Sequence, residues 1–186
     1  MKFTSSSKKL RQSIAALGTV VLTTLGTLGA AKAVDFGQQE VQQNKFVAVA
    51  MPYAGNRYNL FIFEQISKTQ PCWQLSSSGS AIAVDLLLQK FDFTGICGRN
   101  SDTNGYSIRQ AGQDLSWRYN LNIVKRDSEL VLLGVSSTDP NAPPLEIGKT
   151  YGVTNGFTKI VLNPGWRFTK RTYNGKVLGH TYLTSD

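Results

Sequence analysis

Residues 166–183 read WRFTKRTYNGKVLGHTYL, and this stretch carries the strongest local structural signal in the chain. Two runs rich in aromatic and β-branched residues flank Asn174-Gly175, and an Asn-Gly pair supplies the positive φ angles that a type I′ turn requires. We therefore predict a β-hairpin with a two-residue turn and with strands over 166–173 and 176–183.

A second hairpin is predicted upstream of the first. Residues 115–124 alternate between apolar and polar side chains with a period of two, which is typical of a strand with one buried and one solvated face. Asp127 and Ser128 then turn the chain into an apolar run over 130–135, which can pair back on the first strand.

Residues 45–186 as a whole show strand patterns and hardly any helical ones. Short apolar runs over 46–51 and 58–66 are separated by turn residues, and only 80–90 fits a helix as well as a strand. We expect 45–186 to form a single all-β domain, an antiparallel β-sandwich or barrel built from hairpins. Residues 34–44, VDFGQQEVQQN, are rich in glutamine and have no apolar period, so we predict a polar tether there.

The two hairpins resemble each other in sequence. TNGY at 103–106 and WRY at 117–119 recur in the same order as TNGF at 154–157 and WRF at 166–168. This order suggests an internal duplication, in which two related hairpin units build one sandwich or barrel. The alternative is a chance recurrence of short sequence patterns that are common in β-turns and strands. The sequence does not decide between duplication and chance.

Residues 1–33 have the composition of a signal peptide. A basic start is followed by a mostly apolar stretch over 13–28, and Ala31-Lys32-Ala33 offers the small-x-small pattern of a cleavage site. We predict cleavage after Ala33 and an exported product, periplasmic or extracellular. The alternative is an uncleaved membrane anchor, although 13–28 contains two glycines and four threonines and falls short of the ~20 strongly apolar residues that a span needs.

The predicted signal peptide also accounts for most of the positive charge. The chain has 20 basic and 12 acidic residues, which gives a formal charge of +8. Five of the basic residues and none of the acidic ones lie in 1–33, so 34–186 carries 15 basic against 12 acidic residues, or +3. This small excess on an exported protein argues against nucleic acid as a partner. We expect no membrane span after cleavage.

Cys72 and Cys97 are the only cysteines in the chain. In an oxidising compartment, an isolated pair in a small exported domain is more often a disulfide than two free thiols. We predict a Cys72–Cys97 disulfide, whose loop closure would stabilise the fold by about 3.5 kcal/mol. Because the chain has one histidine, a metal site at these cysteines lacks further ligands, and we expect no metal and no other cofactor.

The candidate binding residues lie on one face of the last hairpin. Pairing around the two-residue turn places His180 opposite Thr169, away from the apolar face that must form the core. The opposite face of the hairpin, which we expect to be solvated, combines cations with aromatic rings. Such a face suits acidic sugars, because rings stack on sugar faces and guanidinium groups bind acid groups. The predicted ligand-binding residues are Arg167, Arg171, Tyr173, Lys176, His180 and Tyr182. The alternative is that the basic residues only keep the hairpin soluble.

Catalytic residues are not evident in the sequence. His180 would face solvent without a carboxylate to orient it, so a Ser-His-Asp or Cys-His device has no local support. A two-carboxylate hydrolase could draw on Glu64, Asp85 and Asp92, although the sequence gives no distance between them. Residues 100–105 begin like a calcium loop but lack the acidic residues that complete one, so we predict a hydrogen-bonded Asx turn there.

Seven stretches together resemble one known family. They are FVAVAMPY (46–53), FIFEQIS (61–67), PCW (71–73), FDFTGICGRNSDTNGYSIR (91–109), AGQDL (111–115), NGF (155–157) and PGWRFTKRTYNGKVLGHTYLTSD (164–186). The pattern is similar to that of the exported cyanobacterial proteins grouped as domain-of-unknown-function family 3747. The resemblance covers nearly all of the chain after the predicted signal peptide and implies a cyanobacterial exported protein. Because that family has no established activity, the resemblance implies no catalytic residue.

We expect from these observations a non-enzymatic protein of the cell envelope or extracellular matrix that binds acidic polysaccharide or peptidoglycan through the last hairpin. The alternatives are a structural or accessory partner of another exported protein and a carbohydrate hydrolase. An exposed cluster of the hairpin's cations and rings would favour the first function. A flat apolar patch would favour the second, and a deep cleft with two carboxylates the third.

Overall fold

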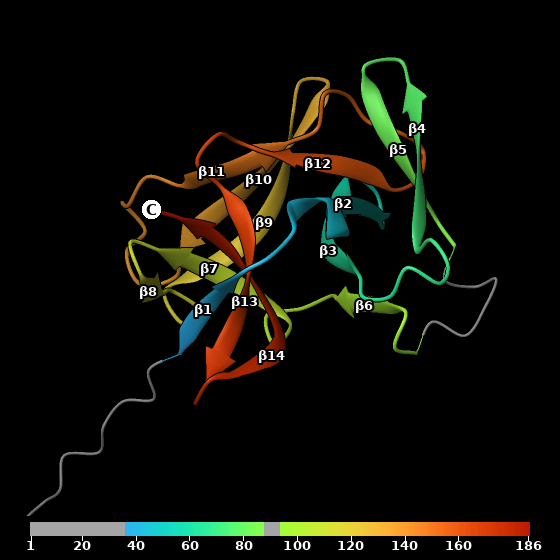
Figure 1. Ribbon diagram of the computed structural model, residues 1–186. Coiled ribbons are helices and arrows are strands. Elements are labelled where there is room, and N and C mark those ends of the chain that lie inside the picture. Colours follow the sequence, from blue (N-terminus) through green and yellow to red (C-terminus); the bar gives the residue numbers. More distant parts are fainter. Residues whose placement is uncertain (1–35, 88–93) are drawn as a thin grey trace, which may run out of the picture. The chain divides into compact units, whose positions relative to one another are not determined.

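Strands make up nearly all of the regular structure in the computed structural model, which describes residues 36–87 and 94–186 (Figure 1). In these two ranges the one helical element is a 3-10 turn, η1 (Gln43–Lys45), and no helix is long and apolar enough to cross a membrane. The fourteen strands are β1 (Gly37–Glu40), β2 (Phe46–Tyr53), β3 (Arg57–Gln65), β4 (Trp73–Ser78), β5 (Ala81–Leu86), β6 (Cys97–Asn100), β7 (Tyr106–Gln110), β8 (Gln113–Asp114), β9 (Tyr119–Arg126), β10 (Glu129–Ser136), β11 (Leu145–Lys149), β12 (Thr158–Leu162), β13 (Arg167–Tyr173) and β14 (Lys176–Ser185). The predicted all-β fold class is confirmed.

The strands form two sheets. One has five strands in the order β1-β13-β14-β7-β8, and the other has nine, of which seven run in the order β6-β3-β2-β12-β11-β10-β9. The β4–β5 hairpin, green in Figure 1, joins the larger sheet where β5 meets the start of β12. The described pairings are antiparallel, as predicted, except that β7 pairs with β14 in parallel.

The main core lies where the curled sheets face each other as a sandwich, with the larger sheet forming part of a barrel. Ile108 of β7, Leu132 of β10 and Leu183 of β14 are fully buried there. Gly134 allows the sheets to approach closely, because a Cβ atom at that position would lie 2.4 Å from Cδ1 of Ile108. The last strand of the larger sheet, β9, comes next to β3 without pairing with it, so the barrel has an unpaired seam.

The last hairpin has the predicted turn but a different register. Asn174 and Gly175 have φ angles of 49° and 74°, the positive values that a type I′ turn requires. A bulge then shifts the pairing, so that Thr169 lies opposite Tyr182 rather than His180. The shift amounts to two residues and therefore keeps each side chain on its predicted face.

Two predicted strands differ in extent from the observed ones. The strand expected over 115–124 begins only at Tyr119, because residues 115–118 form a turn closed by the Arg118 and Tyr119 amides, which donate to the Leu115 carbonyl. Within the run over 80–90, residues 81–86 form strand β5, and 88–90 lie outside the described residues.

Part of the predicted tether belongs to the five-stranded sheet, which corrects the prediction for 34–44. Residues 37–40 form β1 and pair with β13. Gln43 continues this attachment, because its side-chain amide donates to the Phe168 carbonyl at 2.9 Å and accepts from the Phe168 amide at 2.8 Å. Hydrogen bonds hold the segment together with isolated apolar contacts, of Phe36 with Tyr173 and of Val41 with the main core, and two such isolated residues give no apolar period.

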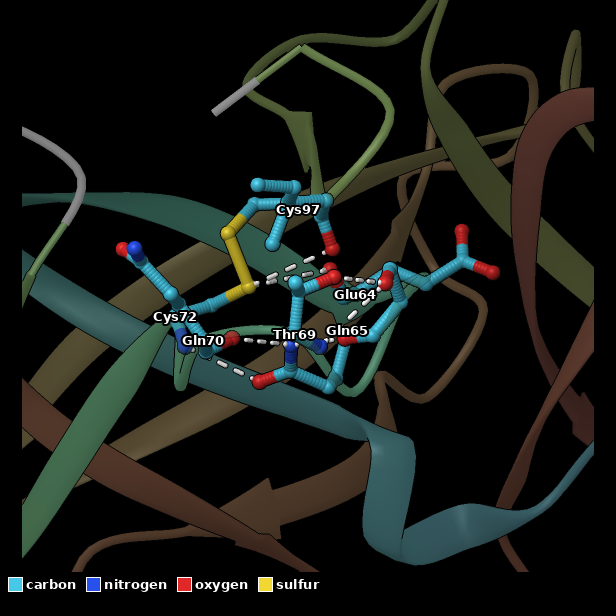
Figure 2. Close-up of a disulfide and its surroundings, with 8 residues drawn as sticks. Glu64, Gln65, Thr69, Gln70, Cys72 and Cys97 are labelled. Atoms are coloured by element: carbon cyan, nitrogen blue, oxygen red, sulfur yellow. Dashed lines mark hydrogen bonds between the residues drawn. A yellow bond between two sulfur atoms is a disulfide. The ribbon is translucent and has the colours of Figure 1, made fainter. Parts of the chain in front are cut away.

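The predicted disulfide is confirmed. Cys72 and Cys97 are joined with an S–S distance of 2.03 Å, which links the segment after β3 to the start of β6 (Figure 2). Gln65 of β3 supports this segment, because its Oε1 accepts from the Cys72 amide at 2.9 Å and its Nε2 donates to the Gln70 carbonyl at 2.8 Å. The crosslink therefore holds the chain between β3 and β4 against the edge of the larger sheet.

The two hairpins of the suggested duplication lie in different sheets. The β9–β10 hairpin ends the larger sheet, whereas β13–β14 belongs to the smaller one. Trp117, before β9, is 65% exposed, but its sequence counterpart Trp166 packs against the main core. The duplication stays a prediction.

Candidate functional site

The polar face of the last hairpin, which the sequence predicts to be a wet binding surface, is largely buried. Tyr182 is fully buried and His180 is only 6% exposed. Of the six predicted binding residues, only Tyr173 and Lys176, beside the turn, are exposed. The prediction of one exposed cluster is therefore wrong.

Neighbouring strands explain why this face is covered. β1 adds to β13 on one side, and β7 with β8 adds to β14 on the other. The Phe36 ring lies 4.5 Å from the Arg171 guanidinium, and Asp114 of β8 pairs with Arg171 at 2.7 Å. Alternation in the sequence identifies the side chains that share a face, but it does not show that other strands bring partners onto that face.

Asp114 organises the resulting polar network. Its Oδ2 accepts hydrogen bonds from Arg171 and from the Tyr182 hydroxyl, both at 2.7 Å, and its Oδ1 accepts from the Ser116 amide. Burial opposes ionisation of Asp114, but the hydrogen bonds and the charge of Arg171 outweigh burial and lower the pKa of the carboxyl. Burial, followed by the bond to Asp114, raises the pKa of Tyr182 to about 12. At neutral pH the network therefore contains a carboxylate and a protonated phenol.

His180 forms a buried pair with Ser107, a residue that the sequence did not single out. Its Nδ1 lies 2.7 Å from the Asn104 carbonyl oxygen, which only accepts, so Nδ1 carries the proton. Nε2 then accepts from the Ser107 hydroxyl at 2.8 Å. Burial lowers the pKa of His180, and the charge of Arg171 adds to this against the opposing hydrogen bond to Asn104. The prediction of a surface histidine is wrong.

Ser107 donates to His180 as a catalytic serine would donate to its general base, but the pair is enclosed by protein. Ser107 is 5% exposed, lies within a strand and also accepts from Arg171 Nη2 at 3.4 Å. A reacting serine has to meet its substrate, and this one is enclosed by protein. We assign the pair to the packing of the smaller sheet.

Arg167 is held by two carboxylates. Its guanidinium lies 3.0 Å from Glu40 of β1 and 3.0 Å from Asp186. Hydrogen bonds to Glu40 and then to Asp186 raise the pKa of Arg167 above its usual value. Because Arg167 and Arg171 already pair with acidic residues, the last hairpin offers little free charge to a ligand.

The carboxylates considered for hydrolysis are not gathered at one site in the described residues. Glu64 forms an ion pair with Lys170 at 2.8 Å. Asp85 is exposed on β5, and Asp92 lies outside the described residues. In the described ranges, no group of three or more acidic, histidine or cysteine residues is arranged to hold a metal ion.

The predicted Asx turn before β7 is confirmed. Asp102 Oδ1 accepts from the Asn104 amide at 2.9 Å, and the Asp102 carbonyl accepts from the Gly105 and Tyr106 amides. The aspartate therefore caps its own backbone in the segment that resembled a calcium loop.

An open groove of about 900 Å³ lies at the barrel seam between β3 and β9, and we call it the seam groove. One wall comes from the β2–β3 turn and β3, and the other comes from β9 and the turn that follows it. Its polar, aromatic and charged lining residues are Tyr53, Asn56, Arg57, Tyr58, Asn59, Ser101, Tyr106, Asn122, Lys125 and Asp127.

Tyrosines line the seam groove from its rim to its interior. Tyr53 is 47% exposed, and the Arg57 guanidinium lies 4.7 Å from the centre of its ring. Tyr106 is buried and donates from its hydroxyl to the Leu60 carbonyl at 3.3 Å. Burial, followed by the charge of Asp102, raises the pKa of Tyr106 to about 12, so the phenol remains a hydrogen-bond donor at neutral pH.

The charged and amide side chains of the seam groove have few partners within the described protein, although Arg57 Nε donates to the Ala54 carbonyl at 3.5 Å. Within the described part of the chain, neither Arg57 nor Lys125 forms an ion pair. The described residues also include no hydrogen-bond partner for the side-chain amides of Asn56, Asn59 and Asn122. Rings that stack on sugars, amides that bond to hydroxyls and cations that hold acid groups are together suited to an acidic saccharide.

Sequence reasoning missed the seam groove because its walls come from strands far apart in the chain. The alternation in β9 marks Asn122 as solvated, and this is the available signal. It does not show that the edge of β9 meets β3, because that meeting depends on the order of all the strands between them.

Comparison with known proteins gives one family. No curated protein and no solved structure matches the chain. The family model described as "Protein of unknown function (DUF3747)" matches residues 13–186, which include all the stretches that carry the resemblance in the sequence. The chain therefore belongs to the DUF3747 family.

Proposed function

We propose that this protein is an exported, non-enzymatic component of the cell envelope or extracellular matrix that binds acidic polysaccharide or peptidoglycan in the seam groove. One observation carries the proposal. Among the described residues, Arg57 and Lys125 have no acidic partner, and they line an open groove that also presents the exposed ring of Tyr53 and the amides of Asn56, Asn59 and Asn122. Acid groups on a sugar chain would supply the missing partners.

Two features of the chain support export. The Cys72–Cys97 disulfide suits an oxidising compartment, since such bonds are rare where thiols are kept reduced. Residues 1–33 have the charge and hydropathy pattern of a signal peptide. A periplasmic or extracellular polymer is then an accessible ligand.

The groove lining supports binding rather than hydrolysis. Hydrolysis by two carboxylates needs an acid and a second carboxylate on opposite sides of the scissile bond. Asp127 is the single carboxylate among the described residues that line the seam groove.

The distribution of exposed apolar side chains supports a polar ligand rather than an apolar docking face. Large exposed side chains in the described ranges come mostly from different elements, and only Tyr173 and Val177 are neighbours, at the turn end of the last hairpin. They are Tyr53, Ile66, Leu75, Trp117, Tyr151, Tyr173 and Val177.

The test uses the protein exported with its own leader and purified with its disulfide formed. Titration calorimetry with oligogalacturonides, and with neutral dextran oligomers as the uncharged control, measures binding. We expect Arg57→Ala to weaken oligogalacturonide binding by about tenfold, which corresponds to about 1.5 kcal/mol for one charge-assisted hydrogen bond.

Lys176→Ala is the matched control, because Lys176 is also an exposed cation but lies on the last hairpin. It should leave binding unchanged. No binding by the wild-type protein would contradict the proposed function, and loss of binding in Lys176→Ala but not in Arg57→Ala would move the site back to the hairpin.

A further inference from the structure

A strip of uncommitted polar side chains continues from the seam groove along the outer face of β9. Tyr119, Leu121 and Ile123 of this strand pack against the main core. Because side chains alternate along a strand, Asn120 and Asn122 point away from that core, and both are exposed. Neither amide has a hydrogen-bond partner in the described ranges.

Trp117 and Arg118 stand at the far end of this strip. Trp117 is 65% exposed, and the Arg118 guanidinium lies 4.4 Å from the centre of its ring. Within the residues that the structure describes, Arg118 forms no ion pair. An exposed indole stacked with a free cation repeats the chemistry of Tyr53 and Arg57 at the groove.

The turn that carries Trp117 is held in place from several sides. The Ser116 amide donates to Asp114 Oδ1 at 2.9 Å, and Ser137 Oγ donates to the Trp117 carbonyl at 3.1 Å. The Ser137 amide also donates to the Arg118 carbonyl at 2.7 Å. The indole is therefore presented on a fixed backbone, which lowers the entropy that a contact with a ligand would cost.

The strip carries no negative charge of its own. Residues 115–126 contain no acidic side chain, and Asp114 turns inward to Arg171 and Tyr182. β9 is also the last strand of its sheet, and in the described structure it pairs only with β10. Exposed residues without negative charge therefore connect Trp117 to the seam groove, whose one acidic lining residue among those described is Asp127.

We infer that the ligand is an extended anionic polysaccharide chain, which occupies the seam groove and continues along β9 to stack on Trp117. This inference rests on the proposed function. The six steps along β9 from Tyr119 to Lys125 alone span roughly 20 Å of extended backbone, several times the width of one sugar ring. A short oligosaccharide would fill the groove alone, whereas a long one would reach both ends.

The test compares galacturonate trimers with decamers on the wild-type protein and on Trp117→Ala. The decamer should bind more tightly than the trimer. Trp117→Ala should weaken decamer binding by about fivefold, the range of one lost aromatic contact, and leave trimer binding unchanged. Tyr173→Ala removes an exposed ring from the last hairpin and should change neither.

Fluorescence gives a second readout, because Trp117 is far more exposed than Trp73 or Trp166. The decamer should protect the protein from iodide quenching, and this protection should be absent with the trimer. Equal affinity for both lengths, or a decamer affinity that Trp117→Ala leaves unchanged, would overturn the extension while leaving the groove intact. No binding of either oligomer would overturn the proposed function together with the extension.

Discussion

Asp114 is the residue on which the polar network of the smaller sheet depends. It forms an ion pair with Arg171 and accepts a hydrogen bond from the Tyr182 hydroxyl. The Asp114 side chain is 17% exposed and the Arg171 side chain 14%. We predict that Asp114→Ala lowers the free energy of unfolding by about 3 kcal/mol, because it leaves a buried guanidinium without its counter-charge. Urea denaturation measures this loss.

Glu146→Ala is the control for the Asp114 prediction. It breaks the Arg126–Glu146 pair, whose side chains are 52% and 46% exposed, and should cost less than about 1 kcal/mol. Similar small losses for both variants would show that the buried network contributes little to stability.

His180 should make stability depend on pH. Its pKa in the folded protein lies below the ordinary value of 6.5, chiefly because of burial. Below pH 6.5 the unfolded chain binds a proton that the folded protein excludes, so the free energy of unfolding falls as pH decreases. Above that pH the imidazole is neutral in both states and contributes no slope.

His180→Gln should remove the part of the pH dependence of the unfolding free energy that comes from His180. Urea denaturation at pH 7.5 and pH 5.5 should show a larger loss of stability for the wild-type protein than for the variant. An equal loss in the two proteins would contradict the buried, neutral histidine.

At the level of elements, the disulfide should be the main stabiliser of the chain between β3 and β6. It closes a separation of 25 residues. We predict that the Cys72→Ser/Cys97→Ser double variant loses about 3.5 kcal/mol of unfolding free energy, since its unfolded chain is less constrained. The wild-type protein measured with a reducing agent should match the variant. A loss below about 1 kcal/mol would contradict this role.

Strands with a strong local pattern could be predicted from the sequence. Asn174-Gly175 gave the last hairpin, and the alternation before Asp127 gave the other one. Strand β1 could not be predicted in this way, because residues 37–40 are polar and are held by pairing with β13 and by the Glu40–Arg167 ion pair. An edge strand of this kind leaves no apolar period to detect.

The order of the strands in the two sheets could not be predicted from the sequence, and the candidate site depends on that order. The residues of the last hairpin were assigned to the correct faces, yet Tyr182 and His180 are buried because β7 and β8 pack beside β14. The seam groove arises in the same way, from the meeting of β3 and β9. Both outcomes depend on contacts between distant strands, which alternation along one strand does not encode.

In the whole molecule, two polar surfaces have different surroundings. The last hairpin, with its cations paired to Glu40, Asp186 and Asp114, serves packing. The seam groove, with no ion pair to Arg57 or Lys125 in the described structure, is the surface that we propose for binding. We therefore expect an acidic saccharide to contact the protein at the seam groove and not at the last hairpin.

Hydrogen–deuterium exchange with and without oligogalacturonide shows which of the two surfaces the saccharide contacts. We predict that the ligand slows exchange in peptides that cover 53–60 and 119–127, and leaves exchange in 167–182 unchanged. Protection confined to 167–182, or no protection in any peptide at saturating ligand, would contradict the account.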